Sequence, residues 1–124
     1  MADKISKEIR STVTAEGEIE ISIAHAEKPQ PGENEVLIRV EASPVNPSDL
    51  GLLISFAADL DSLSVSGSGE STVAKMKIHK GLMKAVKPRI GQSMKVGNEG
   101  GGVIEDAGSS AKDLIGKTVG LAGG

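Results

Sequence analysis

Apolar and polar residues alternate in the first part of the chain, at the period-two spacing of strands with one buried face. The segment IRSTVT is rich in β-branched residues, and Ile19, Ile21 and Ile23 share one face of the segment after it. Between the two lies Ala-Glu-Gly at 15–17, which is a turn signal. The pattern predicts a β-hairpin over residues 9–26.

A further strand is predicted at EVLIRVEAS, residues 35–43. Alternate residues from Val36 to Val40 are apolar and share one face of this segment. Leu37 adds apolar cover on the other face. Strands that are apolar on both faces are typical of a sheet covered on both sides, so we expect this strand to be buried on both sides.

The middle of the chain is less regular. Two prolines in SPVNPSDL end the strand pattern, and Ser48 with Asp49 is expected to open a short helix. The next segment, LGLLISFAADLDSL, is apolar at helical spacing, and SVSGSGEST is typical of a flexible link. A helix near 81–87 would end at Pro88. We therefore predict an irregular or helical insertion over residues 51–95.

The last stretch predicts two more strands, GGVIEDAG and KTVGLAG, joined by a turn at SSAKDLIG. Short strands with closely spaced turn signals and no internal repeat are typical of an all-β barrel. The glycines at 97 and 100–102 are most simply devices for a bulge or a close approach of strands. Such a bulge would also admit the edge of a cofactor.

Composition narrows the class of protein. The chain has 124 residues, which suits one domain, and it has no cysteine, so disulfides and thiolate chemistry are excluded. Its net charge is −3 and it has a single aromatic residue, which argues against nucleic-acid binding. No run reaches the ~20 apolar residues of a membrane span, and the charged N-terminus does not resemble a secretory signal. We expect a soluble cytoplasmic protein without a membrane partner.

Three segments, in this order, carry a resemblance to a known family: PQPGENEVLIRVEAS, then VNPSDL, then VGNEGGGVIEDAGSS with KTVGLAGG. Together they resemble the zinc-independent quinone oxidoreductase branch of the medium-chain dehydrogenase/reductase superfamily. The resemblance covers about residues 9–50 and 94–124, and the stretch 52–93 fits it poorly. It implies that residues 1–124 are the N-terminal portion of a GroES-like catalytic domain, a mainly β, partly open barrel. It also implies that a Rossmann cofactor domain, which we expect to be absent from this chain, follows in the intact protein.

The resemblance also bears on zinc. Zinc-dependent relatives bind catalytic zinc through a Cys and a His at the positions that match Asn46 and Asn98 here. Neutral amides are poor zinc ligands beside thiolate and imidazole. The four cysteines of the structural zinc site of those relatives have no counterpart. We therefore expect no metal. A two-histidine site from His25 and His79 is not expected either, because the two lie far apart in the sequence.

The resemblance implies an NADPH-dependent reductase of quinones or other conjugated carbonyls, with NADH as a possible alternative cofactor. Asn46 and Asn98 are the candidate cofactor-binding residues, and Asn46 and Ser48 are the candidate catalytic residues. An amide both donates and accepts hydrogen bonds, which suits a neutral ring or carbonyl. A hydroxyl at Ser48 suits donation to a substrate oxygen. Asp49 and Glu99 are assigned supporting hydrogen bonds, and we expect the isolated chain to be inactive.

Other interpretations stay open at this point. Asn46 between two prolines is also a common turn residue, and Ser48-Asp49 is also a common helix cap. A free-standing GroES-like interaction module, with residues 52–70 as its mobile loop, is the alternative function. The stretch 75–95 holds seven Lys or Arg and no acid. It is either a solvated face or a patch for an anionic group such as a cofactor phosphate. Relatives are commonly dimers, so a homodimer is expected.

Overall fold

The computed structural model describes residues 4–55 and 57–123. These residues are mainly β, with 50% in strands and 19% in helices, which confirms the predicted class. The strands are β1 (Ile5–Val13), β2 (Glu18–Glu27), β3 (Val36–Ala42), β4 (Ala58–Ser66), β5 (Val73–Ile78), β6 (Ser93–Lys95), β7 (Glu99–Ala107) and β8 (Thr118–Ala122). The α-helices are α1 (Pro47–Leu53) and α2 (Met83–Val86), and four 3-10 turns are η1 (Gly69–Ser71), η2 (Lys80–Leu82), η3 (Lys87–Arg89) and η4 (Lys112–Leu114).

The chain folds into two compact units that alternate along the sequence. The first unit holds residues 1–26 and 46–96, and the second holds residues 27–45 and 97–124. Each unit has its own antiparallel sheet. The first sheet has the order β4-β5-β2-β1-β6, and the second has the order β3-β7-β8. Neither sheet closes on itself, so neither unit is a barrel.

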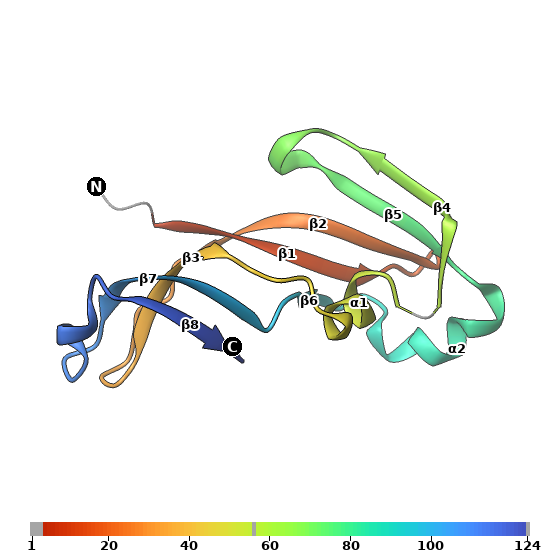
Figure 1. The fold of residues 1–124 in the computed structure, drawn as a ribbon. Coiled ribbons are helices and arrows are strands. Elements are labelled where there is room, and N and C mark those ends of the chain that lie inside the picture. The colour runs from red at the N-terminus through yellow and green to blue at the C-terminus, as the bar shows by residue number, and fades with distance from the viewer. Residues whose placement is uncertain (1–3, 56, 124) are drawn as a thin grey trace. The chain divides into compact units, whose positions relative to one another are not determined.

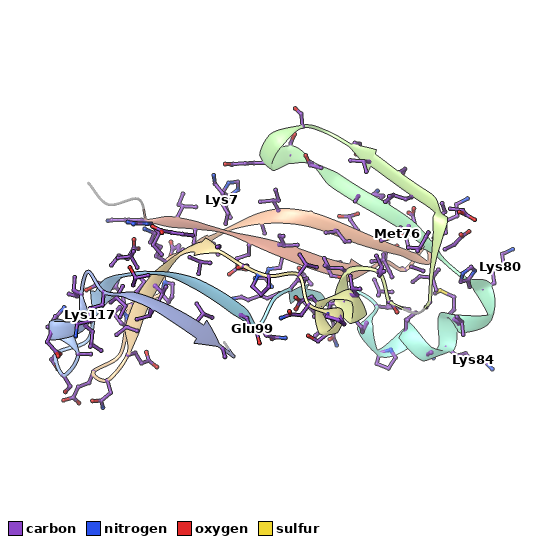
Figure 2. All side chains as sticks on the ribbon, viewed as in Figure 1. Lys7, Met76, Lys80, Lys84, Glu99 and Lys117 are labelled. Carbon is purple, nitrogen blue, oxygen red and sulfur yellow. The ribbon has the colours of Figure 1, made fainter. Side chains whose placement is uncertain are left out.

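The first unit is built on the predicted hairpin of β1 and β2, which form long neighbouring strands in Figure 1. The turn lies at 14–17, where Gly17 takes φ +85°. Its core comes from both strands of the hairpin, from β4 and β5 and from α2: Val13, Ile19, Ala57, Ala58, Met76, Ile78 and Val86. Met76 projects from β5 in Figure 2 and is 2% exposed, so its flexible side chain fills part of the core.

The insertion predicted over residues 51–95 is only partly helical. Helical turns occupy residues 80–89, close to the predicted helix, but β4 and β5 take up most of 58–78 as a hairpin. The prediction of irregular or helical structure is wrong there. Its error has a physical cause, because β4 bulges against β5. Asp59 pairs with Lys77 and Ser64 with Lys75, so four β4 residues face one residue of β5.

The second unit is a sheet with β7 at its centre. The two C-terminal strands, β7 and β8, form where the sequence predicted them, with η4 in the turn. The first strand, β3, is an edge strand, and Val40 on it is 51% exposed. The prediction that this strand is buried on both sides is therefore wrong. Side chains of a strand point to the two faces of its sheet, and the exposed second half of β3 shows that neither face is fully covered there.

No helix in the described part of the chain is long and apolar enough to cross a membrane.

Candidate functional site

The sequence Asn46-Pro47-Ser48-Asp49 forms the first turn of α1, in the first unit. Asn46 is the N-cap residue and has extended backbone angles, φ −90° and ψ 157°. A following proline disfavours helical angles at the residue before it, and proline itself is well placed at the first helical position. The two prolines of this loop therefore help to fix where the helix begins.

Asp49 holds this turn together through its side chain. Its Oδ2 accepts a hydrogen bond of 2.8 Å from the backbone N–H of Asn46, and its own N–H donates to the Asn46 carbonyl at 2.9 Å. The Asp49 side chain is almost fully buried, with the residue 4% exposed. A carboxylate in the first turn also interacts favourably with the helix dipole. Asp49 thus supports the turn, and its other oxygen, Oδ1, is buried without a hydrogen-bond partner among the described residues.

Ser48 and Asn46 differ in their access to solvent. Ser48 is exposed, and within residues 4–55 and 57–123 its hydroxyl makes no hydrogen bond. Asn46 is half-buried. The sequence suggested Ser48-Asp49 as the helix cap. In the structure Asn46 is the N-cap residue, and Ser48 lies inside the first turn. The arrangement presents a hydroxyl to solvent beside a backbone that Asp49 fixes.

The other end of α1 is anchored to β1 and η3 by residues that the sequence did not suggest. The fully buried Ser11 donates its hydroxyl to the carbonyl of Leu52. Arg89 reaches the same serine, with Nη2 at 3.2 Å from Oγ and 3.4 Å from the backbone carbonyl. The contacts between Arg89 and Ser11 join positions that are 78 residues apart in the sequence. Only the position of this serine between Ile9 and Val13, on the same face of β1, hints at them.

Asn98 lies in the second unit, directly before β7, and is exposed. Its backbone carbonyl accepts a hydrogen bond of 2.7 Å from Gly123 N–H, which ties the start of β7 to the end of β8. Asn46 and Ser48 are thus brought together on α1, whereas Asn98 is placed by a different unit. Glu99, the other residue assigned a supporting role, is the exposed first residue of β7.

The glycines of β7 permit a close approach of the neighbouring strand. A Cβ at Gly102 would lie 2.0 Å from the carbonyl oxygen of Arg39 on β3. The ladder between β3 and β7 also shifts register twice, between Leu37 and Ile38 and between Val40 and Ala42. These observations match the predicted role of the glycines as devices for bulges and close strand contact.

The described residues contain no group of three or more His, Cys, Asp or Glu side chains that could hold a metal ion. His25 instead pairs with Glu70, with 2.9 Å between Nε2 and Oε2. Glu70 also pairs with Lys7 of β1. The hydrogen bond from Lys7 and then that from His25 lower the pKa of the Glu70 carboxyl. This cluster joins the turn between β4 and β5 to the β1–β2 hairpin, and Figure 2 shows Lys7 on β1.

No family model matches this chain, and no curated protein matches it.

Proposed function

We propose that this chain is the N-terminal portion of the GroES-like catalytic domain of an NADPH-dependent, zinc-independent quinone or conjugated-carbonyl oxidoreductase. The observation that carries the proposal is the first turn of α1. Asn-Pro-Ser-Asp, which belongs to one of the three segments that together carry the resemblance, forms a fixed turn that presents a hydroxyl to solvent. A mainly β scaffold with two antiparallel sheets is compatible with the fold that the proposal requires.

The residues of this turn fit a neutral carbonyl or a nicotinamide ring. Asp49 fixes the backbone of Asn46 through a 2.8 Å hydrogen bond, so the Asn46 side chain starts from a defined position. Ser48 has a hydroxyl without a partner among the described residues, and it is open to solvent. Both side chains donate and accept hydrogen bonds without carrying charge, as recognition of an uncharged carbonyl requires.

NADPH would supply the hydride when bound, because no side chain of this turn is a reductant. The turn supplies orientation and polarisation. Ser48 donates a hydrogen bond to the substrate carbonyl oxygen, which stabilises the negative charge that develops there as hydride is added to the conjugated system. Asn46 orients the substrate carbonyl and the nicotinamide ring relative to each other. Asp49 keeps Asn46 in place by accepting a hydrogen bond from the Asn46 backbone N–H.

The test uses the longest natural chain that contains this sequence, assayed with NADPH or NADH and a panel of small quinones. We expect cofactor oxidation that a chelator leaves unchanged, and a loss of roughly tenfold or more in kcat/KM for Ser48→Ala, with Ser110→Ala, an exposed serine of the second unit, as the control. Oxidation that the chelator abolishes, or equal activity of the Ser48→Ala variant, would contradict the proposal.

An interaction module is the second candidate, and one observation favours it. The segment expected to be a mobile loop contains β4, which carries three largely exposed apolar side chains: Leu60 at 58%, Leu63 at 53% and Val65 at 62%. Exposed apolar clusters often mark contact surfaces for other proteins. If the longest natural chain neither oxidises the cofactor nor binds it, that result favours the interaction module over the reductase.

A further inference from the structure

Residues 80–89 form one continuous helical segment made of η2, α2 and η3. Its inner side contributes Val86 to the core of the first unit, with Leu82 and Met83 packed against that core. Its outer side carries Lys80, Lys84 and Lys87, all exposed, at the i, i+4, i+7 spacing of a single helix face. Figure 2 shows Lys80 and Lys84 projecting outward from this segment. We call these three exposed lysines the basic face.

The charge of the basic face is not neutralised by its surroundings. The chain has 17 acidic residues, but none between Glu70 and Glu99. Two other cations of the same stretch form ion pairs, Lys75 with Glu20 at 3.6 Å and Lys95 with Glu8 at 3.0 Å. No member of the basic face forms an ion pair with any residue that the structure describes.

Repulsion between the lysines of the basic face slightly destabilises this helical segment when no ligand is bound. Like charges at i, i+4 on a helix repel each other and destabilise it slightly. Lysine ammonium groups are strongly hydrated point charges, so they gain most from a ligand that brings several negative charges close together. Three exposed lysines without ion pairs, in a stretch that has no acidic residue, are a favourable place for an anion to bind.

The shape of the basic face indicates which anion fits. The exposed residues between the lysines, Gly81 and Ala85, are small, so no bulky exposed side chain separates the lysine side chains. Neighbouring side chains on one helix face are about 5–6 Å apart at Cβ. A single phosphate would need the three ammonium groups to converge on one point. Ammonium groups spread along the segment suit a ligand with successive phosphates better.

We propose that the basic face binds soluble oligophosphates, meaning anions with two or more successive phosphate groups. The segment offers no aromatic side chain on which bases could stack, which disfavours single-stranded nucleic acid. It exposes no large apolar residue beside the lysines, which disfavours insertion into a lipid surface. The proposal does not depend on the reductase function, because it concerns a different element and needs no reaction.

The experiment titrates the chain with inorganic tripolyphosphate, with orthophosphate and with phosphatidylserine vesicles at low ionic strength. Calorimetry gives the affinities, and NMR locates the binding through the backbone amides of residues 80–89. The test variant is Lys84→Gln/Lys87→Gln. The control is Lys4→Gln/Lys117→Gln, which removes the same charge from two exposed lysines outside the basic face. Both variants change surface residues only, so folding should be unaffected.

We expect tripolyphosphate to bind at least about tenfold more tightly than orthophosphate, and binding to weaken with added salt. The test variant should lose roughly tenfold in tripolyphosphate affinity while the control keeps it. Equal affinities for the two anions, or equal weakening in both variants, would overturn the proposal. Binding to vesicles without tripolyphosphate binding would also overturn it, in favour of a membrane surface.

Discussion

At the scale of single residues, the buried Ser11 has the most consequential side chain of the first unit. Its hydroxyl donates to the carbonyl of Leu52 and lies 3.2 Å from Nη2 of Arg89. A buried hydrogen-bonding group that loses its partner pays the full cost of desolvation, whereas the intact bond contributes modestly. This serine ties the C-terminal end of α1 to β1 and to η3.

We therefore expect Ser11→Ala to lower the free energy of unfolding by about 1–3 kcal/mol, because the Leu52 carbonyl and the Arg89 guanidinium lose a partner. Urea unfolding measures the change. Ser22→Ala is the matched control, since Ser22 is a half-buried strand serine whose side chain makes no hydrogen bond among the described residues. A loss no larger than that of the control would show that Ser11 does not anchor α1.

A second residue-scale prediction concerns acid sensitivity at Glu70. Ion pairing with Lys7 and His25 lowers the pKa of this carboxyl in the folded protein. The pairing therefore stabilises the fold fully above the pKa of an unfolded glutamate, ~4.3, and is lost as pH falls through the lower folded value. The effect is small because the Glu70 side chain is 50% exposed, so solvent screens the interaction.

We expect the stability difference between the unmodified chain and Glu70→Gln to favour the unmodified chain near neutral pH and to vanish in acid. Urea unfolding at a series of pH values measures it. Glu16→Gln provides the control, because Glu16 is also exposed and forms no ion pair with a described residue. A difference that stays constant as pH falls below ~4 would contradict the assigned pairing.

At the scale of elements, the close contact between β3 and β7 depends on glycine. A Cβ at Gly102 would meet the carbonyl oxygen of Arg39 at 2.0 Å and its carbon at 2.8 Å, and these are backbone atoms that cannot rotate away. Overpacking of this kind costs typically ~1–3 kcal/mol. Gly120 on β8 offers a matched contrast, because its nearest neighbour would be 4.0 Å from an added Cβ.

We expect Gly102→Ala to lower the free energy of unfolding of the second unit by about 1–3 kcal/mol. Gly120→Ala should be neutral or slightly stabilising, because it reduces the freedom of the unfolded chain. Hydrogen exchange of β7 amides reports on this unit separately from the first. Equal protection in the two variants would mean that β3 moves aside without cost.

The elements also show how far the sequence alone could lead. Alternating apolar residues and turn signals predicted β1, β2, β7, β8 and the start of α1 close to their observed positions. They failed at β4 because Leu60 and Leu63 are three residues apart, a spacing that is typical of a helix, whereas the structure places both in a bulge of a strand. They failed for the burial of β3 because the sequence does not reveal which strands lie at an edge.

The candidate site was predictable only in part. Asn46, Ser48 and Asp49 are adjacent in the sequence, so a turn residue, a helix start and a cap could be inferred from local chemistry. The contact of Ser11 with Arg89 could not be inferred, because it joins residues 78 positions apart through the pairing of distant elements. Local patterns carry no information about such a contact when no second sequence is compared.

At the scale of the whole molecule, the free sheet edges govern how copies of the chain behave in solution. In the part of the chain that the structure describes, β4 pairs with β5 alone, and it exposes more than half of Leu60, Leu63 and Val65. An open strand edge with apolar side chains is a template for pairing with another chain. The bulge at Leu60–Leu63 interrupts the regular part of β4, which pairs in register with β5 only at 58–59 and at 64–66.

We expect this exposed edge to cause concentration-dependent self-association, in line with the dimer predicted from the resemblance. Light scattering should show a rising mean mass as concentration increases. Val65→Lys should suppress the rise, because a charge at a strand edge disfavours pairing with a second copy. Ile115→Lys is the control, since it adds the same charge at an exposed apolar residue outside the strands. A monodisperse monomer at high concentration would show that the bulge alone is enough to protect the β4 edge. Suppression by both variants would instead assign the association to net charge rather than to β4.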